Sequence, residues 1–229
     1  MAKGSAPRGG KRPATRPAKK RPAPERPAAP APVGPLRLGA VPGATPGKWI
    51  DTWKERHGGS PLELVPIAAA DQRRALTDGD VDAAIVRLPI DVEGLSVIPL
   101  YDELPVVMMS ADSHLTAAED LELEDLAGEV LVTPLDDVLG VEVPESVVPR
   151  FTAPLTTGDA IETVATGVGI VIVPMSLARV HHRKDVEFRI LRDWRSSSVG
   201  FAWPTASTTP AIEAFIGIVR GRTANSSRG

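Results

Sequence analysis

The stretch DQRRALTDGDVDAAIVRL, residues 71–88, decides the fold. Its first part, Asp71–Thr77, predicts a short helix that ends at Gly79, because glycine readily adopts the left-handed conformation that terminates helices. Its second part, Ala83–Leu88, is an apolar run that predicts a buried strand. A helix that leads directly into a buried strand is typical of right-handed βαβ units, whose strands run parallel. The stretch therefore indicates an α/β protein with a parallel sheet.

The same alternation of strand and helix continues on both sides of this stretch. Upstream, strands are predicted at Leu36–Val41 and Leu62–Ala68, with a helix between them. Thr45 and Pro46 have the pattern of an N-cap followed by proline at the first helical position of that helix. Downstream, the pattern predicts strands at Leu95–Tyr101, Pro105–Ser110, Val130–Val132, Glu187–Leu191 and Val199–Trp203, and short or final helices at Leu121–Leu126 and after Thr209–Pro210.

One further helix and strand are predicted near the middle of the chain. Asp159–Glu162 has the spacing of a capping box, and the helix after it places Ile161, Val164, Ala165 and Val168 on one face. The β-branched run Ile170–Val173 is expected as a parallel strand buried on both faces. Residues 135–155 show no readable pattern. The number of strands suits two small lobes better than one wide sheet.

Charge divides the chain into a basic arm and an acidic body. Residues 1–33 hold nine Lys or Arg and one acid, whereas the remaining 196 residues hold 17 bases and 28 acids. Eight prolines and no aromatic residue in the arm predict a disordered segment over residues 1–34. A basic arm favours a polyanion such as DNA as its partner, and the candidate phosphate contacts are Lys11, Arg12, Arg16, Lys19, Lys20 and Arg21. A solubilising extension without a partner explains the same composition.

Several classes of protein are disfavoured by composition and by missing motifs. The chain has no cysteine, which excludes disulfides, thiolate metal sites and cysteine nucleophiles. It has no run of 18 apolar residues and no apolar segment near its start, so we expect a cytoplasmic protein with no membrane span. The nucleophile-elbow, P-loop and dinucleotide-binding motifs are absent, and the adjacent pair His181–His182 lacks metal-ligand spacing. We therefore expect no enzyme activity, no cofactor and no metal.

The order of several segments is similar to that of a known family. The segments are LTDGDVDAAI (76–85), LYDELPVV (100–107), SADSHL (110–115), LEDLAG (123–128) and VATGVGIVIVP (164–174). Together they make residues 36–221 resemble the substrate-binding, or effector-binding, domain of LysR-type transcriptional regulators. The third segment departs from the family pattern, with Ser113 before the histidine and Thr116 where alanine is usual.

This resemblance implies a type 2 periplasmic-binding-protein-like fold, an α/β architecture with two lobes joined by two crossing strands. Lobe 1 would comprise residues 35–101 and 199–222, lobe 2 residues 102–198, and residues 223–229 would form a flexible tail. The resemblance also implies an effector in the cleft and a homodimer paired through the first helix. Family members carry a winged helix-turn-helix ahead of this domain, whereas only the arm is expected here, so regulation is not carried over directly.

Candidate ligand-binding residues follow from the rule that open α/β sheets bind ligands beyond the carboxyl ends of their strands. They are Ala44, Thr45, Ala70, Asp71 and Arg87 in lobe 1, with Thr133, Thr157 and Pro174 facing them from lobe 2. Each polar member also has a structural interpretation, since Thr45, Asp71 and Thr157 can cap helices and Arg87 can be ion-paired or solvated. Helix starts that converge on one cleft favour an anionic or zwitterionic organic ligand.

Three functions fit these observations. The first is an effector-binding protein of LysR type, acting as a ligand sensor or accessory transcriptional regulator, with weak DNA contact by the arm. The second is an architectural DNA-binding protein in which the fold is only a dimerising body. The third, an enzyme on the same fold such as a dehydratase, lacks a nucleophile or a matched acid–base pair.

Overall fold

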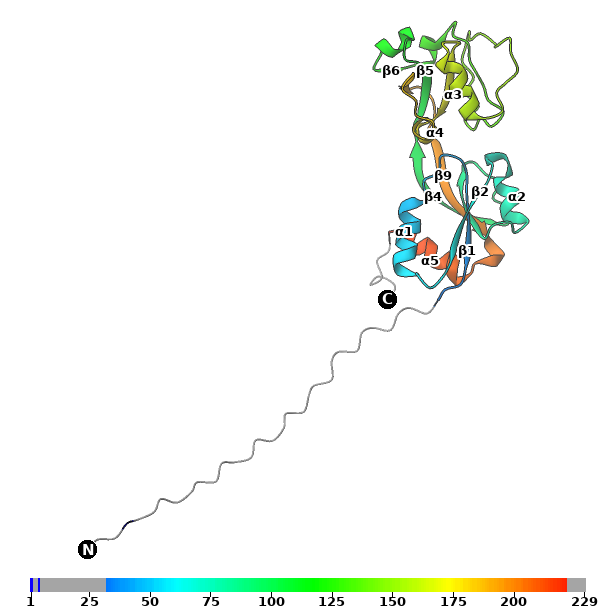
Figure 1. The fold of residues 1–229 in the computed structure, drawn as a ribbon. Coiled ribbons are helices and arrows are strands. Elements are labelled where there is room, and N and C mark those ends of the chain that lie inside the picture. The colour runs from blue at the N-terminus through cyan, green and yellow to red at the C-terminus, as the bar shows by residue number, and fades with distance from the viewer. Residues whose placement is uncertain (2–3, 5–31, 222–229) are drawn as a thin grey trace. The chain divides into compact units, whose positions relative to one another are not determined.

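The computed structural model describes residues 1, 4 and 32–221, and it divides the chain into two units, 1–31 and 32–229 (Figure 1). The six basic residues proposed to contact DNA, Lys11 to Arg21, lie outside the described residues. Among the described helices, none combines the length and apolarity needed to cross a bilayer.

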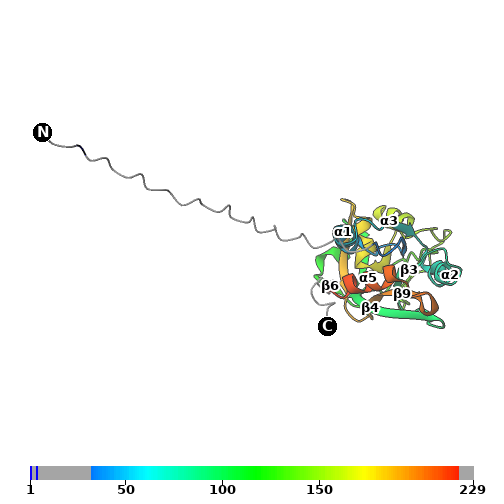
Figure 2. The same ribbon diagram turned by 90° about the horizontal axis from the view of Figure 1, so that it is seen from below.

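Lobe 1 is built on a five-stranded sheet with the order β2-β1-β3-β9-β4. Its strands are β1 (Leu36–Ala40), β2 (Leu62–Pro66), β3 (Ala83–Arg87), β4 (Leu95–Glu103) and β9 (Ser197–Pro204). Its helices are α1 (Gly47–Arg56), α2 (Gln72–Thr77) and α5 (Pro210–Val219), with single 3₁₀ turns at Ala69–Asp71 and Thr205–Ser207. Helices α1 and α5 pack together on one face of the sheet and α2 covers the other (Figure 2).

Lobe 2 contains a four-stranded sheet with the order β6-β8-β5-β7. Its strands are β5 (Pro105–Ser110), β6 (Asp120–Leu121), β7 (Ile170–Pro174) and β8 (Val186–Leu191), and its helices are α3 (Thr157–Ala165) and α4 (Met175–Val180). Single 3₁₀ turns cover His114–Ala117 and Leu123–Leu126. The long segment between residues 127 and 156 carries no helix or strand, only two isolated bridges at Val130 and Leu131.

Each sheet has its own core, which explains why the chain forms two lobes. In lobe 1, the rings of Trp53, Phe201 and Phe215 pack together with centroids 5.2 to 6.1 Å apart. In lobe 2, alternate residues of β7 point to opposite sides, Val171 and Val173 toward α3 and Ile170 and Ile172 toward the 115–143 side. The chain crosses between the lobes at Leu104, where β4 gives way to β5, and again before β9 (Figure 1). The two-lobed α/β fold with crossing strands is thus confirmed.

The prediction of parallel sheets is wrong in part. Strand β1 pairs in parallel with β2 and β3, but β9 pairs antiparallel with both β3 and β4. In lobe 2, β7 is buried along its whole length as expected, yet it pairs antiparallel with β5. Strand β9 re-enters lobe 1 from lobe 2, so it runs against β3. An apolar run buried on both faces reads the same in either direction, so the sequence pattern does not fix the pairing.

Several predicted boundaries are also corrected. The N-cap of α1 is Pro46 and no side chain caps that helix, so Thr45 does not have the capping role. The capping box of α3 pairs Thr156 with Asp159, three residues before the predicted start, and Val168 lies beyond the helix with 42% of its surface exposed. Residues 130–132 form isolated bridges instead of a strand, and the helix expected at Leu121–Leu126 is a two-residue strand followed by a 3₁₀ turn.

Candidate functional site

A cavity of about 400 Å³ lies between the two lobes. Lobe 1 contributes the segments that follow β2 and β3, and lobe 2 contributes parts of the long irregular segment. The lining residues are Ala68, Ala69, Ala70, Gln72, Arg87, Leu88 and Pro89 from lobe 1, and Leu135, Asp136, Asp137, Val138 and Leu155 from lobe 2. The location agrees with the rule that ligands bind beyond the carboxyl ends of sheet strands.

Gln72 holds the lobe 1 wall in place. It is the first residue of α2 and its side chain is buried against the end of β3. Its Nε2 donates to the carbonyl oxygen of Arg87, and the backbone N–H of Arg87 donates to its Oε1, both at 2.9 Å. This pair of bonds satisfies the backbone N–H and C=O of Arg87, which lie beyond the last pairing of β3 with β1 at Ile85. The Leu88–Pro89 peptide bond that follows is cis.

Arg87 is ion-paired inside the protein. Its Nη1 lies 3.0 Å from Glu103 Oε2, and the two side chains are only 5% and 9% exposed. The guanidinium also donates to Ser197 Oγ at 3.0 Å, and to Pro42 O and Ser176 Oγ at 3.3 Å each. Ser176 Oγ in turn donates to Glu103 Oε2 at 2.8 Å. We call Arg87, Glu103, Ser176 and Ser197 the Arg87 network; it joins the crossing strands to α4 of lobe 2.

Two aspartates form the opposite wall. Thr157 Oγ1 donates to Asp136 Oδ1 at 2.9 Å, so the first turn of α3 orients that carboxylate. Asp137 accepts the backbone N–H groups of Leu139 and Gly140, each at 3.0 Å. This acidic pair lies in the segment without a readable sequence pattern, and the structure places it in the cleft wall.

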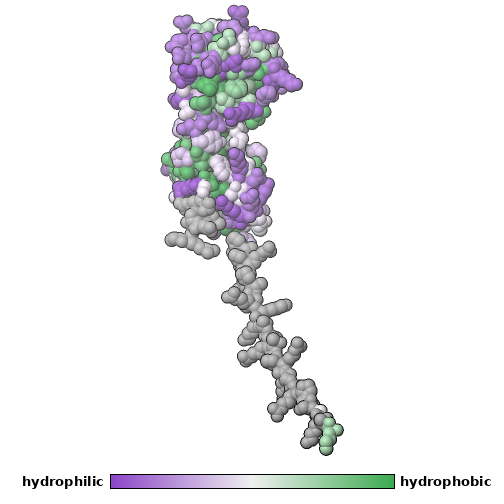
Figure 3. All heavy atoms as spheres, turned by 90° about the vertical axis from the view of Figure 1, so that its left-hand side faces the viewer, coloured by the Kyte–Doolittle hydropathy of each residue, from purple (hydrophilic) through white to green (hydrophobic). Residues whose placement is uncertain are grey.

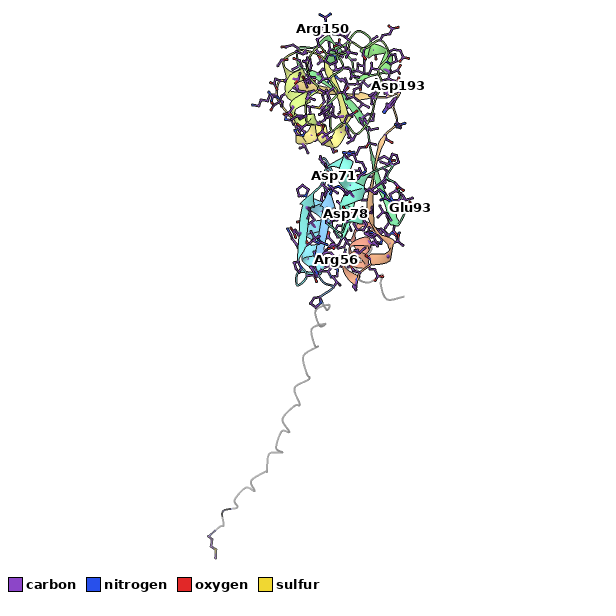
Figure 4. All side chains as sticks on the ribbon, turned by 90° about the vertical axis from the view of Figure 1, so that its right-hand side faces the viewer. Arg56, Asp71, Asp78, Glu93, Arg150 and Asp193 are labelled. Carbon is purple, nitrogen blue, oxygen red and sulfur yellow. The ribbon has the colours of Figure 1, made fainter. Side chains whose placement is uncertain are left out.

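The structure brings only part of the predicted ligand set together. Ala70 and Arg87 line the cavity. Thr157 is not a lining residue, but it is hydrogen-bonded to the lining residue Asp136. Asp71 lies where lobe 1 faces lobe 2 (Figure 4), but its carboxylate is 3.1 Å from Arg74 of its own helix and caps nothing. Pro174 is the N-cap residue of α4 and is not among the lining residues.

The remaining three candidates lie at other hollows. Ala44 lines an open apolar pocket beside β2, and Thr133 lines one of about 300 Å³ on lobe 2. Thr45 lines another pocket, together with Tyr101 of β4 and Arg179 of α4. Burial raises the pKa of the Tyr101 hydroxyl in that pocket. Among the cleft residues outside the predicted set, Gln72 and Leu88 adjoin the predicted Asp71 and Arg87 in the chain. Asp136 is also outside that set, and its place in the wall comes from a tertiary contact with Thr157.

A two-lobed α/β domain with a cavity at the lobe junction is the class of protein that this geometry defines. The chain belongs to the family of LysR substrate-binding domains, whose family model matches residues 30–224. Among curated relatives, the chain is 24% identical over 204 residues to the Hca operon transcriptional activator HcaR of Escherichia coli strain K12. It is 31% identical over 143 residues to the HTH-type transcriptional regulator CatR of Pseudomonas putida.

These matches cover the relatives only in part. They span 83% of this chain and 68% of HcaR, and 58% of this chain and 48% of CatR. By their names both relatives are transcriptional regulators, which confirms the expectation that this domain is not an enzyme.

Solved structures agree with the family assignment. The reduced regulatory domain of OxyR from Pseudomonas aeruginosa is 26% identical with a TM-score of 0.64, and the match covers 82% of this chain and 98% of that one. Full-length BenM shares the fold at 22% identity and a TM-score of 0.68, with 86% and 70% covered. Within residues 32–221, no group of His, Asp or Glu side chains is arranged to hold a metal ion.

Proposed function

We propose that residues 32–221 sense a small organic effector and that effector binding is the input of a cytoplasmic transcriptional regulator. The observation that carries this proposal is the cavity whose walls come from both lobes. A ligand held by both walls binds the closed arrangement better than an open one, so it shifts the population toward closure. The Arg87 network lies beside the same cavity and links the lobes, so closure and ligand contact are coupled there.

The ligand-binding role is tested by filling the cavity. Ala70 is exposed and lines the cleft, so Ala70→Trp places an indole where the effector would lie. Ala206 is exposed in the 3₁₀ turn after β9, and Ala206→Trp is the matched control. A panel of small organic acids, amino acids and amines is screened by thermal shift. We expect compounds that raise the melting temperature of wild type and Ala206→Trp but not of Ala70→Trp; compounds that act equally on all three proteins contradict the site.

The proposal includes a homodimer. Edge strand β2 carries the half-exposed Leu64, which lines an open apolar pocket that extends to Pro46, the N-cap residue of α1. Apolar surface of this kind, also visible on both lobes in Figure 3, is commonly covered by a partner. Light scattering after gel filtration is expected to give a dimer mass for wild type and a monomer mass for Leu64→Asp. Equal masses for the two proteins contradict the use of this edge.

The proposal also includes a DNA contact by the basic arm. The arm's nine bases and one acid contrast with an acidic body, so phosphate attraction is confined to residues 1–33. Binding to a DNA duplex is followed by anisotropy over a salt series, with the full chain and with a chain that starts at Gly34. Binding by the full chain alone, with steep salt dependence, supports the contact. If that chain binds DNA but no compound acts on the cleft, an architectural DNA-binding protein becomes the better description.

A further inference from the structure

The charged groups around the cleft are unbalanced. Arg87 is the cation among the lining residues, and Asp136 and Asp137 are the anions. The charge of Arg87 is already matched by Glu103, whose Oε2 lies 3.0 Å away in a buried pair. The two aspartates have no cation within salt-bridge distance among the described residues. A ligand in the cleft therefore meets a net negative field, although the location of its site at strand ends favours anions in general.

Asp136 is oriented for an incoming donor. Its Oδ1 accepts from Thr157 Oγ1 at 2.9 Å, which leaves Oδ2 without a partner among the described residues. Asp137 differs, because both of its oxygens accept backbone N–H groups of the following turn. A carboxylate held by one bond with one free oxygen is suited to a protonated amine, since charge-assisted hydrogen bonds are the stronger ones.

An independent observation concerns the facing wall. The Arg87 side chain is only 5% exposed, yet its Nε has no hydrogen-bond partner among the described residues, while both terminal nitrogens of the guanidinium are engaged. An unsatisfied buried donor is uncommon and costs free energy unless something accepts from it. Arg87 lines the cavity but this nitrogen is covered in the observed arrangement, so an oxygen of a bound ligand becomes its acceptor when the neighbouring side chains shift on binding.

We propose that the effector is an amine-bearing compound, cationic or zwitterionic, whose ammonium binds Asp136 and whose oxygen accepts from Arg87. This inference rests on the proposed ligand-binding function of the cleft. It differs from the expectation of an anionic or zwitterionic ligand, because it keeps the zwitterion and replaces the simple anion with a cation. Asp136 and Asp137 repel simple carboxylates, and Arg87 is already paired with Glu103.

The field in the cleft is tested without knowing the ligand. Two paramagnetic cosolutes of similar size, the cation aminomethyl-PROXYL and the anion carboxy-PROXYL, are compared by their relaxation of amide protons. The variants are Asp136→Asn and the control Asp112→Asn, an exposed aspartate of the same lobe outside the cleft. We expect the ratio of cation to anion relaxation at Val138 and Leu155 to exceed the average for exposed amides. In Asp136→Asn alone, that ratio should fall about twofold, because one nearby charge is lost.

The same variants are applied to compounds that bind wild type but not Ala70→Trp. We expect these compounds to carry an amine and to lose about tenfold in affinity with Asp136→Asn but not with Asp112→Asn. Cleft binders that are plain carboxylates, or amines indifferent to Asp136→Asn, overturn the inference and leave the proposed function standing. A relaxation ratio at Val138 and Leu155 no higher than the average overturns it too. If neither cosolute relaxes these amides and no compound distinguishes Ala70→Trp, both fail, since the cleft then admits no solute.

Discussion

Arg87 illustrates how its surroundings decide the role of a charge at the end of a strand. Alone at the end of β3, a guanidinium would favour an anionic ligand. In this chain Glu103, the last residue of the crossing strand β4, has its carboxylate 3.0 Å from Arg87 Nη1. The hydroxyl of Ser197 accepts a second hydrogen bond from the same nitrogen. Removing water from an unpaired guanidinium costs several kcal/mol, roughly, so the partner is required for burial. Arg87 therefore supports the fold before it contacts any ligand.

The first prediction concerns this buried pair. Arg87→Met is expected to lower the free energy of unfolding by about 3 kcal/mol or more, because it leaves Glu103 buried without a cation. The double variant with Glu103→Gln should recover part of that loss, since a neutral amide is easier to bury. Urea denaturation measures both values.

Arg183→Met is the control for this prediction. It breaks a pair with Asp185 whose side chains are 39% and 54% exposed, and such pairs contribute under about 1 kcal/mol. If Arg87→Met cost no more than Arg183→Met, the Arg87 network would not stabilise the fold.

A second prediction at this scale concerns Gly169, the residue immediately before β7. Its φ is +157°, and a Cβ there would overlap the carbonyl oxygen of Val130, which accepts from Ile170 N at 2.9 Å. Gly169→Ala should therefore cost about 1–3 kcal/mol, as overpacking usually does. Gly167 has a φ of +83° and open space around its Cα, so Gly167→Ala should cost only about 1 kcal/mol. Thermal unfolding compares the two, and the reverse order would contradict the role of the Val130 contact.

At the scale of elements, the length of a helix or strand and the regularity of its apolar pattern determine whether the sequence predicts it. The apolar runs of β1, β3 and β7 were predicted within two residues of their observed bounds, and the capped, amphipathic α5 was predicted to start where it does. Helix α4 was missed, because six residues make fewer than two turns and show no periodicity. Residues 127–156 form no helix or strand, so their apolar side chains follow no period either.

The candidate site divides in the same way. Arg87 and Ala70 were found because a topological rule applies to the ends of strands. Gln72 lies at the same helix start as Ala70, but its bonds to Arg87 were not predicted. Asp136 was not found, because its position depends on a bond to Thr157 from a distant part of the chain. The acidic character of the cleft also comes from the irregular segment, so no pattern in the sequence predicts it.

Helix α1 carries a prediction about pH. His57 is its C-cap residue, with its ring 5.0 Å from that of the buried Trp53, and burial lowers its pKa, with a further contribution from Arg56. A histidine whose pKa is lowered in the folded state favours folding when it is neutral. That contribution is complete above its ordinary pKa of about 6.5 and is lost as pH falls below this value.

The melting temperature should thus fall from about pH 7.5 to about pH 5 by less in His57→Gln than in wild type. His182→Gln, which changes an exposed histidine, should keep the wild-type pH dependence. If His57→Gln and His182→Gln give the same dependence as wild type, protonation of His57 does not oppose folding.

For the molecule as a whole, hydrogen bonds join the two lobes in addition to the crossing strands. Two crossing strands alone permit hinge motion, which this class of fold uses for switching. Here Ser176 of α4 accepts from Arg87 and donates to Glu103, so one hydroxyl ties lobe 2 to lobe 1. Gly43 allows the close approach, since a Cβ at that position would meet Ser176 Oγ at 2.5 Å. These contacts therefore hold the two lobes in the observed arrangement.

The last prediction tests this restraint through lobe orientation. Residual dipolar couplings of backbone amides from both lobes should fit one alignment tensor in wild type. In Ser176→Ala, the lobe 2 couplings should require a separate tensor of smaller magnitude, because the lobes then reorient independently. Ser146→Ala is the control, since it removes a lobe 2 hydroxyl bonded only to the local Val143 carbonyl. A single tensor in Ser176→Ala would mean that the crossing strands alone hold the lobes, and that the Arg87 network serves stability without controlling closure.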